Sequence, residues 1–164
     1  MIALFVPGCS PPNRPSSGFA DLSGRKINAV ATIGMITDLV RVVGGDRVNV
    51  TGLMGPGVDP HLYKASEGDV RTLGGADIIF YNGLNLEGKM ADVFVRMSAL
   101  RPTAAVTEGM DEQKLREPPE FHGHYDPHVW FDVTLWMGAV KRVEAALATA
   151  FDIRFAFSRY TLGD

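Results

Sequence analysis

The feature that most constrains the fold of this chain is a regular alternation of short apolar runs with segments of helical spacing. Four apolar runs predict strands, at residues 27–33, 47–54, 76–81 and 103–107. Three segments between them predict helices, at residues 35–43, 66–73 and 88–100. This alternation is typical of βαβ units. We therefore predict an α/β fold, a parallel four-stranded sheet flanked by helices.

The two ends of the chain differ from this central region. Residues 1–26 contain a short apolar run, Cys9 and a stretch rich in Pro, Ser and Gly, which indicates a flexible linker. That order is similar to the end of a lipoprotein signal peptide, with Cys9 as the lipid-carrying residue; a leader with an incidental cysteine is the alternative. We expect a folded lobe at residues 27–149.

A further predicted helix begins near Trp130 or Phe131 and loses its helical spacing near residue 150. The aromatic and aliphatic residues that follow are spaced by two, as in a strand. We expect residues 150–164 to form an atypical tail. A frameshift, a fragment boundary and a genuine edge strand would each explain it.

Composition excludes several classes of protein. The 164 residues have a formal net charge of −3, which provides no basic surface for nucleic acid. No apolar run reaches the length of about 18 residues that a membrane-spanning helix needs. A single cysteine excludes an internal disulfide framework.

The tripeptide Asp-Pro-His occurs twice, at residues 59–61 and 126–128. Each copy lies in an expected loop between a strand and a helix, and such loops meet at the carboxyl edge of a parallel sheet. Imidazole is a common ligand of first-row transition metals, and proline stiffens the chain beside it. We predict that His61 and His128 are metal ligands, with surface histidines as the alternative. Asp59 and Asp126 would orient an imidazole or cap and close the loops, and we favour the second role.

Two histidines do not complete a metal site, because structural zinc takes four ligands and catalytic zinc takes three and a water. His122 and His124 are candidate accessory ligands in a polar loop, although an exposed pair of this kind is more often incidental. No catalytic residue is predicted, since neither loop contains an H-E-x-x-H pattern. Three other prominent residues have structural interpretations. Trp130 and Trp136 are expected to pack the core, and Glu87 to be a charge at a helix N-terminus.

Four segments together closely resemble the TroA/ZnuA family of zinc- and manganese-binding proteins, and its TroA branch most of all. They are residues 31–40, 52–63, 76–87 and 126–133. The resemblance covers residues 27–149 and implies the N-terminal lobe of a two-lobed solute-binding protein. It also implies that His61 and His128 are ligands from this lobe, and that His124 falls in a variable His-rich loop. The remaining ligands, a His or Glu and a carboxylate, would come from a C-terminal lobe.

The resemblance implies a function as well. Such a protein is periplasmic or anchored at the cell surface as a lipoprotein, and it is not an enzyme. It captures Zn²⁺ or Mn²⁺ as the transported ligand and passes the ion to the membrane permease of an ABC importer. The alternatives are an adhesin-like or non-functional fragment and, with less support, a metallohydrolase. Without a second lobe, the uncovered face predicts self-association.

Overall fold

The predicted strands form one parallel sheet in the computed structural model, which describes residues 24–151. The strands are β1 (Ile27–Ala31), β2 (Val48–Gly52), β3 (Ile78–Tyr81) and β4 (Thr103–Ala105). Their order is β2-β1-β3-β4, with every neighbouring pair parallel. The predicted fold class is therefore confirmed. The strand order reverses between β1 and β3, and the carboxyl side of such a switch point is where open α/β sheets bind ligands.

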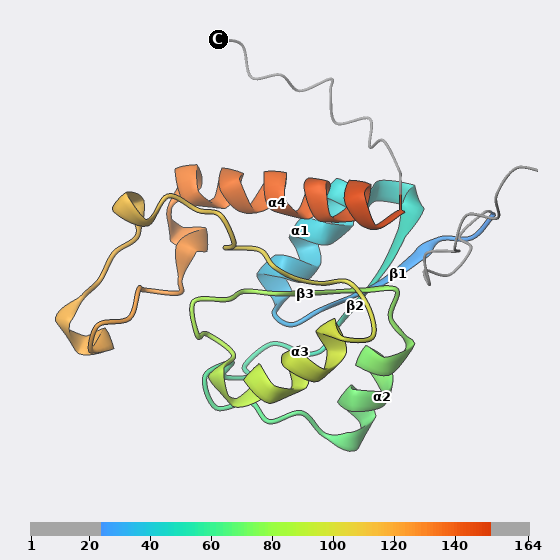
Figure 1. Ribbon diagram of the computed structural model, residues 1–164, viewed down its shortest axis with the longest axis horizontal. Coiled ribbons are helices and arrows are strands. Elements are labelled where there is room, and N and C mark those ends of the chain that lie inside the picture. The colour runs from blue at the N-terminus through green and yellow to red at the C-terminus, as the bar shows by residue number, and fades with distance from the viewer. Residues whose placement is uncertain (1–23, 152–164) are drawn as a thin grey trace, which may run out of the picture.

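Helices cover both faces of the sheet (Figure 1). Helices α1 (Gly34–Gly44) and α4 (Val133–Phe151) pack together on one face, and α2 (Glu67–Gly75) and α3 (Ala91–Ser98) lie on the other. The central strands are buried from both sides, which explains why their sequences are continuously apolar. Ile78, Ile79 and Phe80 of β3 are completely buried. None of the helices within residues 24–151 is long and apolar enough to cross a membrane.

The helix boundaries follow from local capping. Ser66 begins α2 with a reciprocal capping box, in which its hydroxyl accepts from the Asp69 backbone N–H and the Asp69 carboxylate accepts from the Ser66 backbone N–H. The last helix begins at Val133 and not near Trp130, because the Asp132 carboxylate accepts the backbone N–H groups of Thr134 and Leu135 at 2.8 and 3.1 Å.

Short 3₁₀ turns account for the other differences from the predicted elements. The predicted helix at 88–100 begins as a 3₁₀ turn, η2 (Gly88–Met90), before α3. Another, η5 (Val129–Phe131), occupies the position at which the last helix was expected to begin. Three more connect the elements: η1 (Gly45–Arg47), η3 (Glu112–Lys114) and η4 (Pro119–Phe121). Helix α4 continues to Phe151, and the rest of the expected tail lies outside the described residues.

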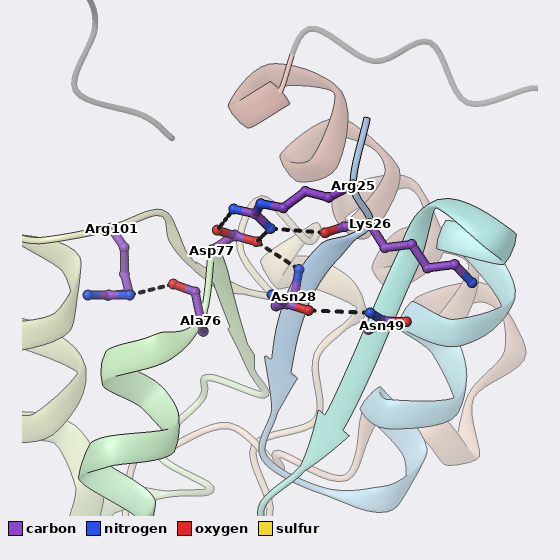
Figure 2. A network of polar contacts seen from close by, with 7 residues as sticks. All are labelled: Arg25, Lys26, Asn28, Asn49, Ala76, Asp77 and Arg101. Atoms are coloured by element: carbon purple, nitrogen blue, oxygen red, sulfur yellow. Dashed lines mark hydrogen bonds and ion pairs between the residues drawn. The ribbon is translucent and has the colours of Figure 1, made fainter. Parts of the chain in front are cut away.

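Charged and polar side chains pair with one another at the amino edge of the sheet (Figure 2). The Arg25 guanidinium donates two hydrogen bonds to the Asp77 carboxylate, at 2.7 and 2.8 Å, and the backbone N–H of Asn28 donates a third at 2.8 Å. The hydrogen bonds from Arg25 hold the pKa of Asp77 below its usual value despite partial burial. The Asp77 charge is thus paired within the chain.

Candidate metal site

The two Asp-Pro-His loops meet at the opposite, carboxyl edge of the sheet. The loop with His61 follows β2, and the loop with His128 belongs to the long segment after β4, at the left of Figure 1. The Nε2 atoms of these two histidines lie 3.4 Å apart, and their ring centroids lie 5.4 Å apart with the planes tilted by 55°. Residues separated by 67 positions in the sequence are thereby brought into one site.

The separation of the two Nε2 atoms suits a shared tetrahedral ion. Zinc–imidazole bonds are about 2.0–2.1 Å long, so two nitrogens at a tetrahedral angle lie about 3.3–3.4 Å apart. An ordinary N–H donor lies closer than this to its acceptor, at about 2.7–3.2 Å. The observed 3.4 Å therefore fits two ligands of one ion better than two rings that share a proton.

Asp126 sets the tautomer of His128. The Asp126 Oδ1 atom lies 2.6 Å from His128 Nδ1 and 3.0 Å from the His128 backbone nitrogen. A carboxylate can only accept, so Nδ1 carries a hydrogen, which leaves Nε2 as the ring nitrogen that is available to a metal ion. Partial burial acts to raise the pKa of Asp126, but the hydrogen bonds from His128 outweigh burial and hold this pKa below its usual value.

Asp59 occupies the same position in the first loop but makes a different contact. Its Oδ1 accepts the His61 backbone N–H at 2.9 Å, which closes the turn. Asp126 closes its own turn in the same way and also holds the imidazole. Neither aspartate caps a helix; Asp132 caps α4. The two copies of the motif therefore share a loop-closing role, and Asp126 additionally orients a ring.

Apolar residues surround the histidine pair. A cavity of about 360 Å³ is lined by both histidines and by Met35, Met54, Val58 and Trp130 among others. The Trp130 ring lies edge-on to the His128 ring, with centroids 5.2 Å apart. Trp130 packs against the core as expected, and it also forms a wall of the cavity. Trp136 does pack against the core.

The remaining predicted site residues do not join the pair. His122 follows η4 in the left-handed conformation, and both it and His124 are exposed. No group of three or more His, Cys, Asp or Glu side chains within residues 24–151 has the arrangement of a metal site. Cys9 lies outside the described residues. The described part of the chain therefore provides two imidazoles, and a complete coordination shell needs further ligands.

Glu87 lies at the N-terminus of η2, as expected, but it is buried inside the fold. Only 3% of the residue is exposed, and its Oε1 accepts hydrogen bonds from the Thr32 hydroxyl at 2.6 Å and the Asn82 backbone N–H at 2.8 Å. Burial raises the pKa of Glu87 against the opposing effect of these hydrogen bonds. The sequence clue to this site is the turn dipeptide Asn82-Gly83 just after β3, because the Asn82 backbone N–H is one of the two donors to Glu87. At Gly83, φ is +87°, and a Cβ would lie 2.5 Å from the Thr107 hydroxyl oxygen.

This fold and this site define a family. The chain belongs to the ZnuA family, described as zinc-uptake complex component A, periplasmic, whose profile matches residues 29–153. The resemblance noted from the sequence is thereby confirmed.

Named relatives include proteins described for either metal. The manganese-binding lipoprotein MntA of Bacillus subtilis is 46% identical over 126 residues, which are 77% of this chain and 41% of that protein. The zinc-binding protein TroA of Treponema pallidum is 50% identical over 118 residues, 72% of this chain and 38% of that protein.

Solved structures agree with this assignment. The periplasmic zinc-binding protein TroA from Treponema pallidum superimposes with a TM-score of 0.72 at 47% identity, over 77% of this chain and 45% of that one. The chain thus spans about two fifths of the length of the curated relatives it matches.

Proposed function

We propose that this chain provides the first half of the metal site in the solute-binding component of a zinc or manganese ABC importer. The observation that supports the proposal best is the 3.4 Å separation of the His61 and His128 Nε2 atoms, with the second ring held by Asp126. Two neutral imidazoles bind a divalent ion without neutralising its charge. Further ligands, carboxylates among them, would come from outside the described residues.

The proposed activity is capture and release without covalent chemistry. The ion is bound extracytoplasmically, in the periplasm or at the cell surface, and is delivered to the importer's membrane permease. Both relatives named above are described as binding proteins, one for manganese and one for zinc. The pair of nitrogens in this chain favours zinc. Nitrogen ligands bind zinc more tightly than manganese, and the observed 3.4 Å separation matches two ligands of a tetrahedral zinc ion.

Calorimetric titration with Zn²⁺ and Mn²⁺ tests the proposal on the full chain and on single variants. We expect zinc to bind more tightly than manganese, and His61→Ala or His128→Ala to weaken zinc binding at least about a hundredfold, since each removes one of two ligands. His124→Ala is the matched control, because this exposed histidine lies outside the pair. Unchanged zinc affinity in either ligand variant would exclude that histidine from the site.

The surface around the pair suggests how a second set of ligands approaches. Phe131, Val133 and Leu62 are 83%, 76% and 68% exposed, and each lies within five residues of a site histidine. As an alternative source of the missing ligands, we propose that two copies of this chain associate through these exposed apolar side chains, so that four imidazoles surround one zinc ion. Sedimentation analysis would then show a dimer that needs zinc and dissociates on addition of a chelator. A monomer at saturating zinc would exclude this association.

A further inference from the structure

A buried hydrogen-bonded network connects the carboxyl ends of all four strands, directly beneath the two histidine loops. At its centre is the Glu87 carboxylate, which accepts from Thr32 just after β1 and from Asn82 just after β3. The Thr107 hydroxyl, just after β4, donates to the Asn82 carbonyl at 2.7 Å. The backbone N–H of Met54, just after β2, donates to the Thr32 carbonyl at 2.9 Å. The network therefore spans the switch point of the sheet.

This network reaches the His128 loop through one side chain. The Asn82 amide nitrogen donates to the Pro127 carbonyl at 2.9 Å, and this contact is buried. Pro127 immediately precedes His128, so the peptide that supports the imidazole is fixed to the end of β3. The Asp126 contact then fixes the ring itself.

The His61 loop is attached at the other end of the network. Met54, which bonds to Thr32, also lines the cavity and leads into the loop that ends at His61. Thr32 therefore links the Glu87 carboxylate to the strand end from which the first histidine loop departs. The two loops approach from different strands, and the distance between their imidazoles depends on how these strand ends are held relative to one another.

The network contains buried polar atoms that a purely structural core would avoid. Glu87 Oε2 and Asn82 Oδ1 are buried and have no hydrogen-bond partner among the described residues. A buried polar atom without a partner costs stability, and an apolar core of the same shape would avoid that cost. The Glu87 carboxylate does, however, connect two strands, because its Oε1 atom accepts hydrogen bonds from residues at the ends of β1 and β3.

We propose that Glu87 is a positioning residue for metal binding, which sets the separation of His61 and His128 through Thr32 and Asn82. The inference rests on the proposed function, because it treats this separation as the determinant of affinity. Glu87 itself contacts neither histidine and is not a ligand. Groups that orient metal ligands typically account for about ten- to a hundredfold in affinity.

The test compares variants of the network with a buried control outside it. Glu87→Ala and Thr32→Val remove the central tie, whereas Glu87→Gln preserves an oxygen that can accept both hydrogen bonds. The control is Thr37→Val, because Thr37 is also a buried threonine, but its hydroxyl donates within α1 to the Ile33 carbonyl. Each variant is compared at a temperature at which circular dichroism shows it folded.

We expect Glu87→Ala and Thr32→Val to weaken zinc binding by about ten- to a hundredfold and to change the visible absorption spectrum of bound Co²⁺, which reports coordination geometry. Glu87→Gln should restore affinity to within about threefold of the wild type, and Thr37→Val should leave affinity and spectrum unchanged. If folded Glu87→Ala and Thr32→Val both bind zinc with wild-type affinity and give the wild-type Co²⁺ spectrum, the inference is wrong.

A measurement without metal separates this inference from the proposed function. Amide hydrogen exchange at His128 should accelerate in Asn82→Ala and Glu87→Ala, but not in Thr37→Val, because only the first two release the loop. If the wild type fails to bind zinc while exchange at His128 still responds, the proposed function fails and the positioning of this loop stands. If exchange does not respond, the positioning role is refuted whatever the zinc affinity.

Discussion

The polar groups at the two edges of the sheet have different partners. At the amino edge, the Asp77 carboxylate accepts three hydrogen bonds from Arg25 and the Asn28 backbone, all within the chain (Figure 2). At the carboxyl edge, His61 and His128 turn nitrogen atoms toward each other at 3.4 Å. The paired carboxylate contributes to stability, whereas two ring nitrogens at this distance are placed to share a cation, as the proposed function requires.

The pKa values of the carboxylates at the two edges are shifted in opposite directions from their ordinary values. Hydrogen bonds from Arg25 hold the pKa of Asp77 low, so this group favours the ionised form. Burial raises the pKa of Glu87, so ionisation is less favourable there than in water. The fold thus stabilises the charge of Asp77 and disfavours the charge of Glu87. Substitutions at the two edges should therefore affect different measurements.

Among changes that leave both imidazoles in place, the largest effect is expected from the aspartate that orients a ring. Asp126→Ala removes the acceptor that keeps the hydrogen on His128 Nδ1, and zinc affinity should fall by about ten- to a hundredfold. Asp59→Ala is the matched control, because Asp59 occupies the same place in its motif but accepts only the His61 backbone N–H. Calorimetric titration of the two variants gives the answer. Equal losses would mean that loop closure, and not ring orientation, determines affinity.

The architecture was accessible from the sequence because it depends on local patterns. The strands of a doubly covered sheet must be apolar along their whole length, and β3 is recognisable for that reason. The Asp-Pro-His motifs were informative because they occur twice at the same kind of position. Both signals involve residues that are adjacent or regularly spaced, and therefore no knowledge of tertiary contacts was required.

The supporting parts of the site were not accessible in this way. The Glu87 carboxylate meets Thr32 across 55 positions, and a glutamate before a helix is ordinarily an exposed charge. Its burial depends on the packing of α3 and on the turn after β3. The difference between Asp59 and Asp126 was equally hidden, because identical tripeptides differ only in where each imidazole is directed.

A smaller effect is expected at the amino edge, on stability alone. Asp77→Asn loses the charged hydrogen bonds and should lower the free energy of unfolding by about 1–2 kcal/mol near pH 7, discounted for the exposure of the pair. Because the pKa of Asp77 is lowered on folding, its contribution is present above its ordinary pKa of 3.8 and disappears as the pH falls through the folded value. Denaturant titrations at pH 7 and pH 3 measure this. Zinc affinity of Asp77→Asn should not change. A loss of affinity would show that the amino edge also affects metal binding.

The smallest effect is expected from Glu87→Gln, which should raise the free energy of unfolding, whereas Asp77→Asn should lower it. A carboxyl group whose pKa is raised on folding contributes most below its ordinary pKa of 4.5, and this contribution is lost as the pH rises through the folded value. Glutamine has no charge to lose, so the variant should gain stability relative to the wild type between pH 4 and pH 8, on the order of 0.5 kcal/mol. As the pH rises, the stability of Asp77→Asn relative to the wild type should therefore fall, whereas that of Glu87→Gln should rise. If both variants lose stability relative to the wild type as the pH rises, the fold stabilises the ionised form of Glu87. The contrast between the amino edge and the carboxyl edge then does not include this residue.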